Sequence, residues 1–231
     1  GLGDVYKRQE VAVMKEVAKK LPQYEFQFVP TSDDDLLIGV ESGKYDIGTK
    51  GAWKTPAREK KYIFPKNNIA ASVIGVTIRK EDANTIKNLD DFAKAGKKLV
   101  PIAPQNAQYQ VIEDYNAAHP DHPVKLEASE NFQVADAYTW VLEGRYDGYF
   151  SIELAYKKNV EAPDAPYKDF KDKLSYFRYK AIPTYTVINK NDKELAEQVD
   201  KALGELKQEG KIAELENKYF GEEVSKLIDV K

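Results

Sequence analysis

The sequence predicts an α/β fold made of two lobes, because helix-like and strand-like segments alternate along the chain and the alternation starts again half-way. Short connections between such segments are typical of a mostly parallel sheet covered by helices. A β-branched run over residues 72–79, followed by a polar segment, predicts the point where the chain enters the second lobe. A short strand at residues 185–188 would carry the chain back, so the two crossings would form a hinge.

The composition is that of an ordinary globular protein. The 231 residues are 42% hydrophobic and 32% charged, and no window has the uninterrupted apolar length of a membrane span. A net charge of −3 leaves no basic excess for phosphate binding, so we expect no nucleic-acid partner. The absence of Cys excludes disulfides, thiolate catalysis and Cys-ligated metals.

The sequence predicts that the first lobe begins with a helix followed by a strand. Apolar residues at helical spacing predict a helix over residues 10–21, which Pro22 ends. Alternating large apolar and polar residues predict a strand over residues 24–29 with one face on a core. Ser32 can cap a helix over residues 33–41, and residues 45–49 predict a second strand.

The second lobe repeats this order. A short helix over residues 89–95 precedes a strand at residues 99–102, and the loop at 103–106 opens a helix over about 107–116. A strand that leads into a helix N-terminus is a common anion-binding arrangement. A further helix over residues 132–143 precedes a Gly-x-Tyr-Asp motif at 144–147, which repeats the motif at 43–46. After residue 192, the pattern predicts two helices separated by Gly210.

The chain's two histidines, His119 and His122, lie in a surface turn flanked by proline. Each proline restricts the backbone of the residue before it to extended conformations, and the turn's sequence offers no other ligand set. We therefore expect no metal site at this turn.

Arg58 is the first candidate for a binding residue. It follows a loop at residues 51–56 whose Gly51 lets the backbone approach a ligand closely. A guanidinium offers a carboxylate two parallel, charge-assisted hydrogen bonds, which a Lys ammonium cannot reproduce. The alternative is a strand, a proline turn and an ordinary surface arginine, which is a common combination.

Several stretches together resemble the amino-acid-binding family of bacterial extracellular solute-binding proteins, which feed ABC importers. These stretches are SGKYD at 42–46, TPAR at 55–58, GRYD at 144–147, LKQEGK at 206–211 and KYFG at 218–221. LLIG at 36–39, ASVIGVT at 71–77 and LVPI at 99–102 are most similar to the branch associated with cystine and related sulfur amino acids.

The resemblance implies the type II periplasmic-binding-protein-like fold, in which two α/β lobes joined by two hinge strands close on one small ligand. Residues 10–78 and 186–231 would form the first lobe, and residues 79–185 the second. The implied function is to bind a small zwitterionic amino acid, cystine or a related polar or sulfur amino acid, in the cleft and to deliver it to an ABC permease. The resemblance implies no cofactor and no metal, a monomer, and a periplasmic or lipid-anchored location outside the cytoplasm.

The resemblance also implies roles for individual residues. Arg58 matches the arginine that grips the ligand α-carboxylate, and Gly51 and Trp53 match positions that supply polar contacts around it. Gln105 and Asn106 match the helix-opening loop of the second lobe, which donates to the same carboxylate.

The ammonium end of the implied site departs from the family. Relatives place an Asp where this chain has Ile152, so Glu153 is one candidate for the ligand ammonium. The alternative is that Glu153 is an ordinary first residue of a helix, and that backbone carbonyls and another acid bind the ammonium. The position where many relatives carry an aromatic clamp is occupied by Asp33 here, so Trp53, Tyr62 or Tyr109 would have to replace the missing ring.

Residues 1–9 match nothing in the family and resemble an assembly scar, so we expect a non-native leader there. Relatives carry a first strand and an aromatic ligand loop ahead of the helix at residue 10. We therefore expect an N-terminally truncated chain without its export signal, with an open sheet edge in the first lobe.

Two other function classes are compatible with the same fold. A dehydratase-type enzyme for small acids would need an acid and a base converging in the cleft, and the sequence offers few candidates. A ligand-sensing module of a receptor would normally continue into a membrane span or a signalling domain.

Overall fold

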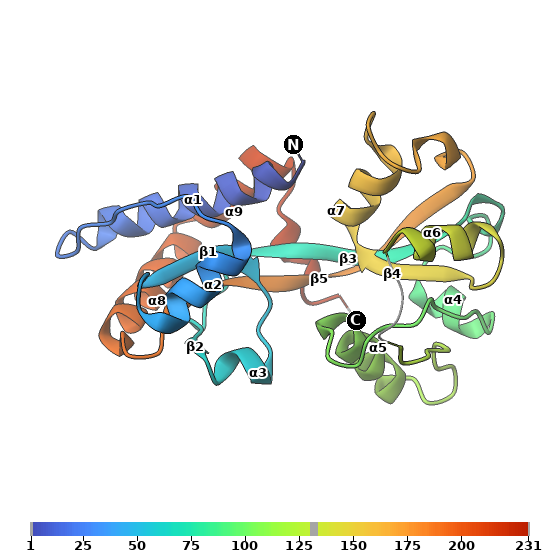
Figure 1. The fold of residues 1–231 in the computed structure, drawn as a ribbon, viewed down its shortest axis with the longest axis horizontal. Coiled ribbons are helices and arrows are strands. Elements are labelled where there is room, and N and C mark those ends of the chain that lie inside the picture. Colours follow the sequence, from blue (N-terminus) through green and yellow to red (C-terminus); the bar gives the residue numbers. More distant parts are fainter. Residues whose placement is uncertain (1, 130–133, 231) are drawn as a thin grey trace. The chain divides into compact units, whose positions relative to one another are not determined.

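The computed structural model describes residues 2–129 and 134–230, and the chain divides into two compact units (Figure 1). Unit 1 joins Gly1–Ser72 to Ala181–Asp229, and unit 2 is built on Val73–Lys180. The chain passes between the units inside strands β3 (Ala70–Arg79) and β5 (Leu174–Asn189). Both passages fall a few residues before the boundaries expected from the sequence.

Unit 1 combines helices with short strands that pair with the second half of β5. Both β1 and β2 run antiparallel to β5, with Ile47 and Ile63 each opposite Ile188. Its further elements are α1 (Leu2–Lys20), α2 (Asp33–Ser42), β1 (Ile47–Ala52), α3 (Pro56–Glu59), β2 (Tyr62–Ile63), α8 (Lys193–Gln208), α9 (Lys211–Phe220) and η4 (Val224–Leu227).

Helices α1, α8 and α9 enclose the main core of unit 1. The apolar stripe of α1, which includes Val13, Met14 and Val17, packs against buried residues of α8 and α9. At about 25 cal/mol per Å² of apolar surface, burial of such side chains is the main stabilising term for these helices. The periodicity of residues 10–21 therefore predicted the correct helical face.

Helix α1 begins at Leu2, eight residues before Glu10, where the sequence predicts its start. The expected leader is part of this helix, and its last residue, Gln9, is fully buried. The Gln9 side-chain amide donates a hydrogen bond to the carbonyl oxygen of Ile69 at 3.2 Å. The ring of Tyr6 lies 4.6 Å from that of Phe220. These contacts hold the first turns of α1 on unit 1.

The strand predicted over residues 24–29 is wrong, because this segment has no regular secondary structure. Tyr24 and Phe26 do pack against the core, as the alternation indicates, whereas Phe28 and Val29 are 47% and 58% exposed. A strand needs a hydrogen-bonding partner as well as an apolar face, and no ladder in the described part of the chain includes this segment.

Unit 2 has its own strand ladder and its own core. Strand β3 pairs antiparallel with β4, from Ile74 opposite Ile152 to Ile78 opposite Gly148. Its further elements are η1 (Lys80–Asp82), α4 (Leu89–Lys94), α5 (Ala107–Ala118), α6 (Val134–Leu142), β4 (Gly148–Ile152), α7 (Glu153–Tyr156), η2 (Lys157–Glu161) and η3 (Lys168–Phe170). Its buried apolar cluster is Val100, Ala137, Tyr138, Val141, Tyr156, Val160 and Leu174.

The mostly parallel sheet predicted from the alternation is wrong for the named strands. The ladders of β1 and β2 with β5, and of β3 with β4, are all antiparallel. Parallel pairing occurs at isolated bridges, such as Leu99 with Gly148 and Ile102 with Ala128, within the segment predicted as a strand. Residues 132 and 133, the start of another predicted helix, lie outside the described residues, and α6 covers the rest of that prediction.

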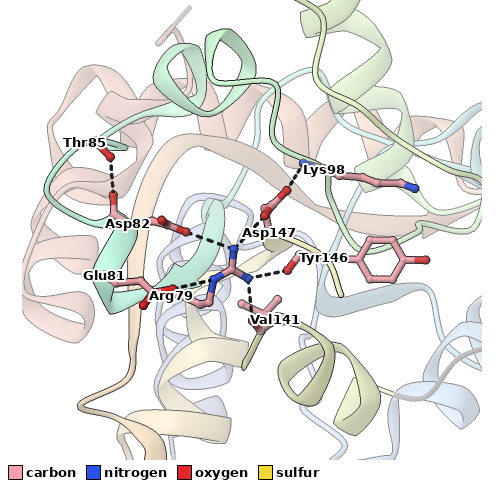
Figure 2. A network of polar contacts seen from close by, with 8 residues as sticks. All are labelled: Arg79, Glu81, Asp82, Thr85, Lys98, Val141, Tyr146 and Asp147. Carbon is pink, nitrogen blue, oxygen red and sulfur yellow. Dashed lines mark hydrogen bonds and ion pairs between the residues drawn. The ribbon is translucent and has the colours of Figure 1, made fainter. Parts of the chain in front are cut away.

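Arg79, at the end of β3, organises a polar network in unit 2 (Figure 2). Its Nη1 donates to the carbonyl oxygens of Val141 and Tyr146, both at 2.8 Å, and its Nη2 donates to Asp147 Oδ1 at 2.8 Å. Asp147 Oδ2 accepts a hydrogen bond from the backbone N–H of Lys98 at 2.9 Å. Asp147 therefore links the end of β3 to the segment at Lys98, and Arg79 links it to the last turn of α6.

The two repeated motifs share a helix-ending glycine. Gly43 and Gly144 have φ values of +88° and +77°, which L side chains rarely adopt. Each glycine follows a helix and precedes the Tyr-Asp pair and a strand, so the repeat predicted from the sequence is confirmed. None of the helices in residues 2–129 and 134–230 is long and apolar enough to cross a membrane.

Candidate ligand-binding site

Arg58 lies in α3, a short helix that the preceding loop positions. Thr55 caps this helix by accepting a hydrogen bond from the Arg58 N–H at 3.2 Å, and Pro56 follows it at the first helical position. The Arg58 guanidinium is partly buried, and its Nη1 donates to the carbonyl oxygen of Trp53 at 2.8 Å. It has no carboxylate partner among the residues that the structure describes. A backbone carbonyl oxygen thus holds the guanidinium, and no acid of the described chain forms an ion pair with it.

Gly51 lies at the end of the strand that leads to this loop and has a φ of +68°. A Cβ added at Gly51 would lie 3.3 Å from the Glu10 carboxyl oxygen Oε1. The glycine therefore provides both the left-handed conformation and the space that this turn requires. The Trp53 carbonyl oxygen contacts Arg58, whereas the roles of Gly51 and Trp53 at a ligand stay predictions.

Glu10 is a functional candidate that sequence reasoning missed. It is only 3% exposed, and burial raises the pKa of its carboxyl to about 8, opposed by a hydrogen bond from the Gly51 backbone. The sequence did contain a signal, because Glu10 lies one helical turn before Val13 and Met14 on the buried stripe of α1. An acid on an apolar face indicates either a buried partner or a shifted pKa.

The aromatic residues proposed as clamps have different environments. Tyr62 is part of the core of unit 1, being 4% exposed, and its hydroxyl donates to the Leu37 carbonyl oxygen at 3.1 Å. Trp53 and Tyr109 are only partly buried. Tyr62 is therefore a packing residue, and its prediction as a ligand clamp is not supported by its burial.

In unit 2, Gln105 and Asn106 precede α5, as the sequence predicts. Both are exposed, and Asn106 caps the helix, because its side-chain oxygen accepts a hydrogen bond from the Gln108 N–H at 3.0 Å. That oxygen is therefore occupied by the cap. The Asn106 amide nitrogen, the Gln105 side chain and the Ala107 N–H are the donors that remain at this loop, because the Gln108 and Tyr109 N–H groups already bond to Asn106.

Glu153 is the first residue of α7, which matches one of the two alternatives left open by the sequence. Its carboxylate pairs with Arg178 through Nε–Oε2 at 2.5 Å and Nη2–Oε1 at 2.8 Å, and with Lys157 Nζ at 3.3 Å. Burial alone would raise the pKa of Glu153, but the hydrogen bonds and charges of Arg178 and Lys157 lower it. Glu153 is therefore a charged acid that two cations already neutralise.

A surface pocket of about 530 Å³ lies within unit 2 and includes Glu153. It contains none of the other residues predicted to bind the ligand. Its lining residues are Lys80, Glu153, Tyr156, Lys157, Glu161, Lys171, Asp172, Leu174, Ser175, Tyr176 and Arg178. Because acids and bases compensate each other across this pocket, the uncompensated guanidinium of Arg58 is the better candidate for an anion site.

The sequence matches the bacterial extracellular solute-binding proteins, family 3, over residues 9–222. The chain belongs to this family. Within family 3, it is 28% identical over 224 residues to the L-cystine-binding protein TcyJ of Bacillus subtilis (strain 168), covering 94% of this chain and 77% of that protein. It is 26% identical over 227 residues to the L-cystine-binding protein TcyJ of Escherichia coli (strain K12), covering 94% and 75%.

Solved structures show the same fold. A probable amino-acid ABC transporter extracellular-binding protein, ytmK from Bacillus subtilis, superposes with a TM-score of 0.65 at 24% identity, covering 92% of this chain and 87% of that chain. An ancestral arginine-binding protein bound to glutamine superposes with a TM-score of 0.54 at 25% identity, covering 93% and 88%. The family and the type II periplasmic-binding-protein-like fold predicted from the sequence are therefore confirmed.

Proposed function

We propose that this family 3 protein binds a small zwitterionic amino acid and delivers it to the permease of an ABC importer. The observation that carries the proposal is the Arg58 guanidinium, which the Trp53 carbonyl holds and which no carboxylate of the described chain neutralises. A fixed guanidinium in this state suits the α-carboxylate of an amino acid. The names of the curated relatives support cystine or a related sulfur or polar amino acid as the ligand.

Each unit supplies donors for the carboxylate in this proposal. Arg58, Gly51 and Trp53 belong to unit 1, whereas Gln105 and Asn106 belong to unit 2. A ligand that contacts both sets favours the conformation in which both are within reach, since only differential contacts shift such an equilibrium. Glu153 is the proposed acid for the ligand ammonium, which would take over hydrogen bonds that Arg178 now makes.

The proposed role involves no bond making or breaking, in agreement with the binding function of the curated relatives. The finer statements about location and assembly are part of the proposal. The protein would act as a monomer outside the cytoplasm, either in the periplasm or anchored to the cell surface by lipid.

Titration calorimetry with a panel of amino acids tests the function. A dissociation constant in the micromolar range corresponds to about −8 kcal/mol. Replacing Arg58 by Lys or Met is expected to weaken binding about 10- to 100-fold, because a hydrogen bond to a charged group contributes about 1.5–3 kcal/mol. Lys61→Met, a change at an exposed cation just beyond α3, is the matched control and should bind like the wild type.

Two outcomes would contradict the proposal. One is heat with sugars or peptides and none with any amino acid. The other is an Arg58→Met variant that keeps wild-type affinity for the amino acid bound by the parent chain, because Arg58 would then not contact the carboxylate.

A further inference from the structure

The fold of unit 2 brings Asp90 to the two histidines of the chain. Asp90 lies in the first turn of α4, whereas His119 ends α5 and His122 follows in the next turn. The Nε2 atoms of His119 and His122 lie 4.0 and 3.9 Å from the same carboxylate oxygen, Asp90 Oδ1. The three potential ligand atoms all lie within 4.8 Å of one another.

The hydrogen bonds at the far side of each ring determine which nitrogen carries the hydrogen. His119 Nδ1 lies 2.8 Å from the carbonyl oxygen of Tyr115, which can only accept, so Nδ1 is the donor. His122 Nδ1 lies 3.0 Å from Asp121 Oδ2, again an acceptor. In the neutral rings, both Nε2 atoms therefore present lone pairs to Asp90.

In this arrangement, the lone pairs of the two Nε2 atoms and of Asp90 Oδ1 face one another. His122 Nε2 is buried and has no hydrogen-bond partner in the described structure. Metal-binding histidines typically donate their second ring N–H to a carbonyl or a carboxylate, which fixes the tautomer and the ring orientation. Tyr115 and Asp121 give both rings this second partner.

We propose that Asp90, His119 and His122 form a binding site for a divalent transition metal of the zinc class. Two imidazoles and one carboxylate are a common ligand set for such ions, with the fourth position open to water. Zinc bonds of about 2.0–2.2 Å place tetrahedral ligands about 3.4 Å apart, so the three side chains need to move by only about 0.5 Å. Asp90 is 51% exposed, so an ion can reach the site from solvent.

Neighbouring contacts hold the ligands in place. The Tyr115 hydroxyl donates a short hydrogen bond to Asp90 Oδ1, and the Tyr115 ring stacks on His119 with centroids 4.1 Å apart. Ligating carboxylates are usually fixed by such hydrogen bonds. The sequence of the turn alone predicts no metal site, because Asp90, the third ligand, lies in a distant segment of the chain.

Titration of the untagged chain with ZnCl₂ alone tests the proposal. We expect one zinc per chain, with binding weakened at least about tenfold by His122→Gln and by Asp90→Asn, because each removes one of three protein ligands. Asp164→Asn, at an exposed acid of the same unit outside the cluster, is the matched control and should leave zinc affinity unchanged.

A ¹⁵N spectrum of the histidine side chains supplies a second readout on the unmodified protein. Because the chain has only two histidines, the spectrum holds two imidazoles, and zinc should shift both Nε2 signals much more than the Nδ1 signals. Absence of zinc binding by the wild type, zinc affinity unchanged in His122→Gln, or a zinc shift confined to Nδ1 would each overturn the proposal. Circular dichroism of each variant confirms that it is folded.

Discussion

At the residue scale, Glu10 is a buried acid next to Gly51 whose carboxyl has a strongly raised pKa. Its pKa rises from 4.5 to about 8, mainly because the buried carboxylate loses its hydration. Folding therefore takes up a proton between these two pH values. The stabilising contribution is fully present below pH 4.5 and is lost as the pH rises through about 8.

Glu10→Gln tests this linkage. The Gln oxygen can still accept from Gly51, but it carries no charge, so the free energy of unfolding should depend less on pH. Compared with this variant, the wild type should lose up to about 1.4 kcal/mol per pH unit between pH 5 and 8. Urea unfolding across this pH range measures the difference. Glu197→Gln, at an exposed acid on α8, should show the wild-type pH dependence, and an identical profile for Glu10→Gln would contradict the raised pKa.

At the element scale, the Arg79 network explains why a polar motif follows α6. The Arg79 side chain is 15% exposed and that of Asp147 25%, so their ion pair is screened less than a surface pair. The same arginine donates hydrogen bonds to the carbonyl oxygens of Val141, in the last turn of α6, and of Tyr146, in the turn before β4. Loss of Asp147 would leave a partly buried guanidinium with weaker compensation, which is more costly than loss of a surface contact.

Asp147→Asn is expected to lower the free energy of unfolding of unit 2 by about 2–3 kcal/mol. Trp140 lies in unit 2 and the chain's other tryptophan, Trp53, in unit 1, so a Trp53→Phe background reports on unit 2 alone. Urea unfolding followed by Trp140 fluorescence measures the change. Glu127→Gln breaks an exposed pair with Lys98 and should cost less than about 1 kcal/mol. Equal effects of the two substitutions would refute the structural role of Asp147.

Local elements were predictable where one short segment contains the whole signal. The Ser32 cap of α2 is confirmed, since its side chain accepts from the Asp35 N–H, and so is the helix that the loop at residues 103–106 opens. Residues 24–29 show the opposite case. Their alternation predicts the packing of Tyr24 and Phe26 on the core but not the exposure of Phe28. Strand formation also depends on a partner elsewhere in the chain, which alternation cannot reveal.

At the scale of the whole molecule, the pairing of strands was not predictable from the sequence. The β-branched runs at β3 and β5 indicate the two linking strands. The antiparallel partners of β1 and the meeting of Asp90 with His119 depend on contacts between distant segments. The roles of Arg58 and Glu153 at a ligand stay predictions, because they depend on the ligand's own groups.

Unit 2 differs from unit 1 in chain continuity, and this difference predicts its behaviour in isolation. Residues 73–180 contain the β3–β4 ladder, the Arg79 network and a buried cluster of their own, whereas unit 1 needs two separate segments. A compact segment with its own core can fold alone. We expect a fragment of residues 73–180 to unfold cooperatively, as followed by circular dichroism and Trp140 fluorescence. The same fragment carrying Asp147→Asn should unfold at lower urea, and a fragment without a cooperative transition would show that unit 2 requires unit 1.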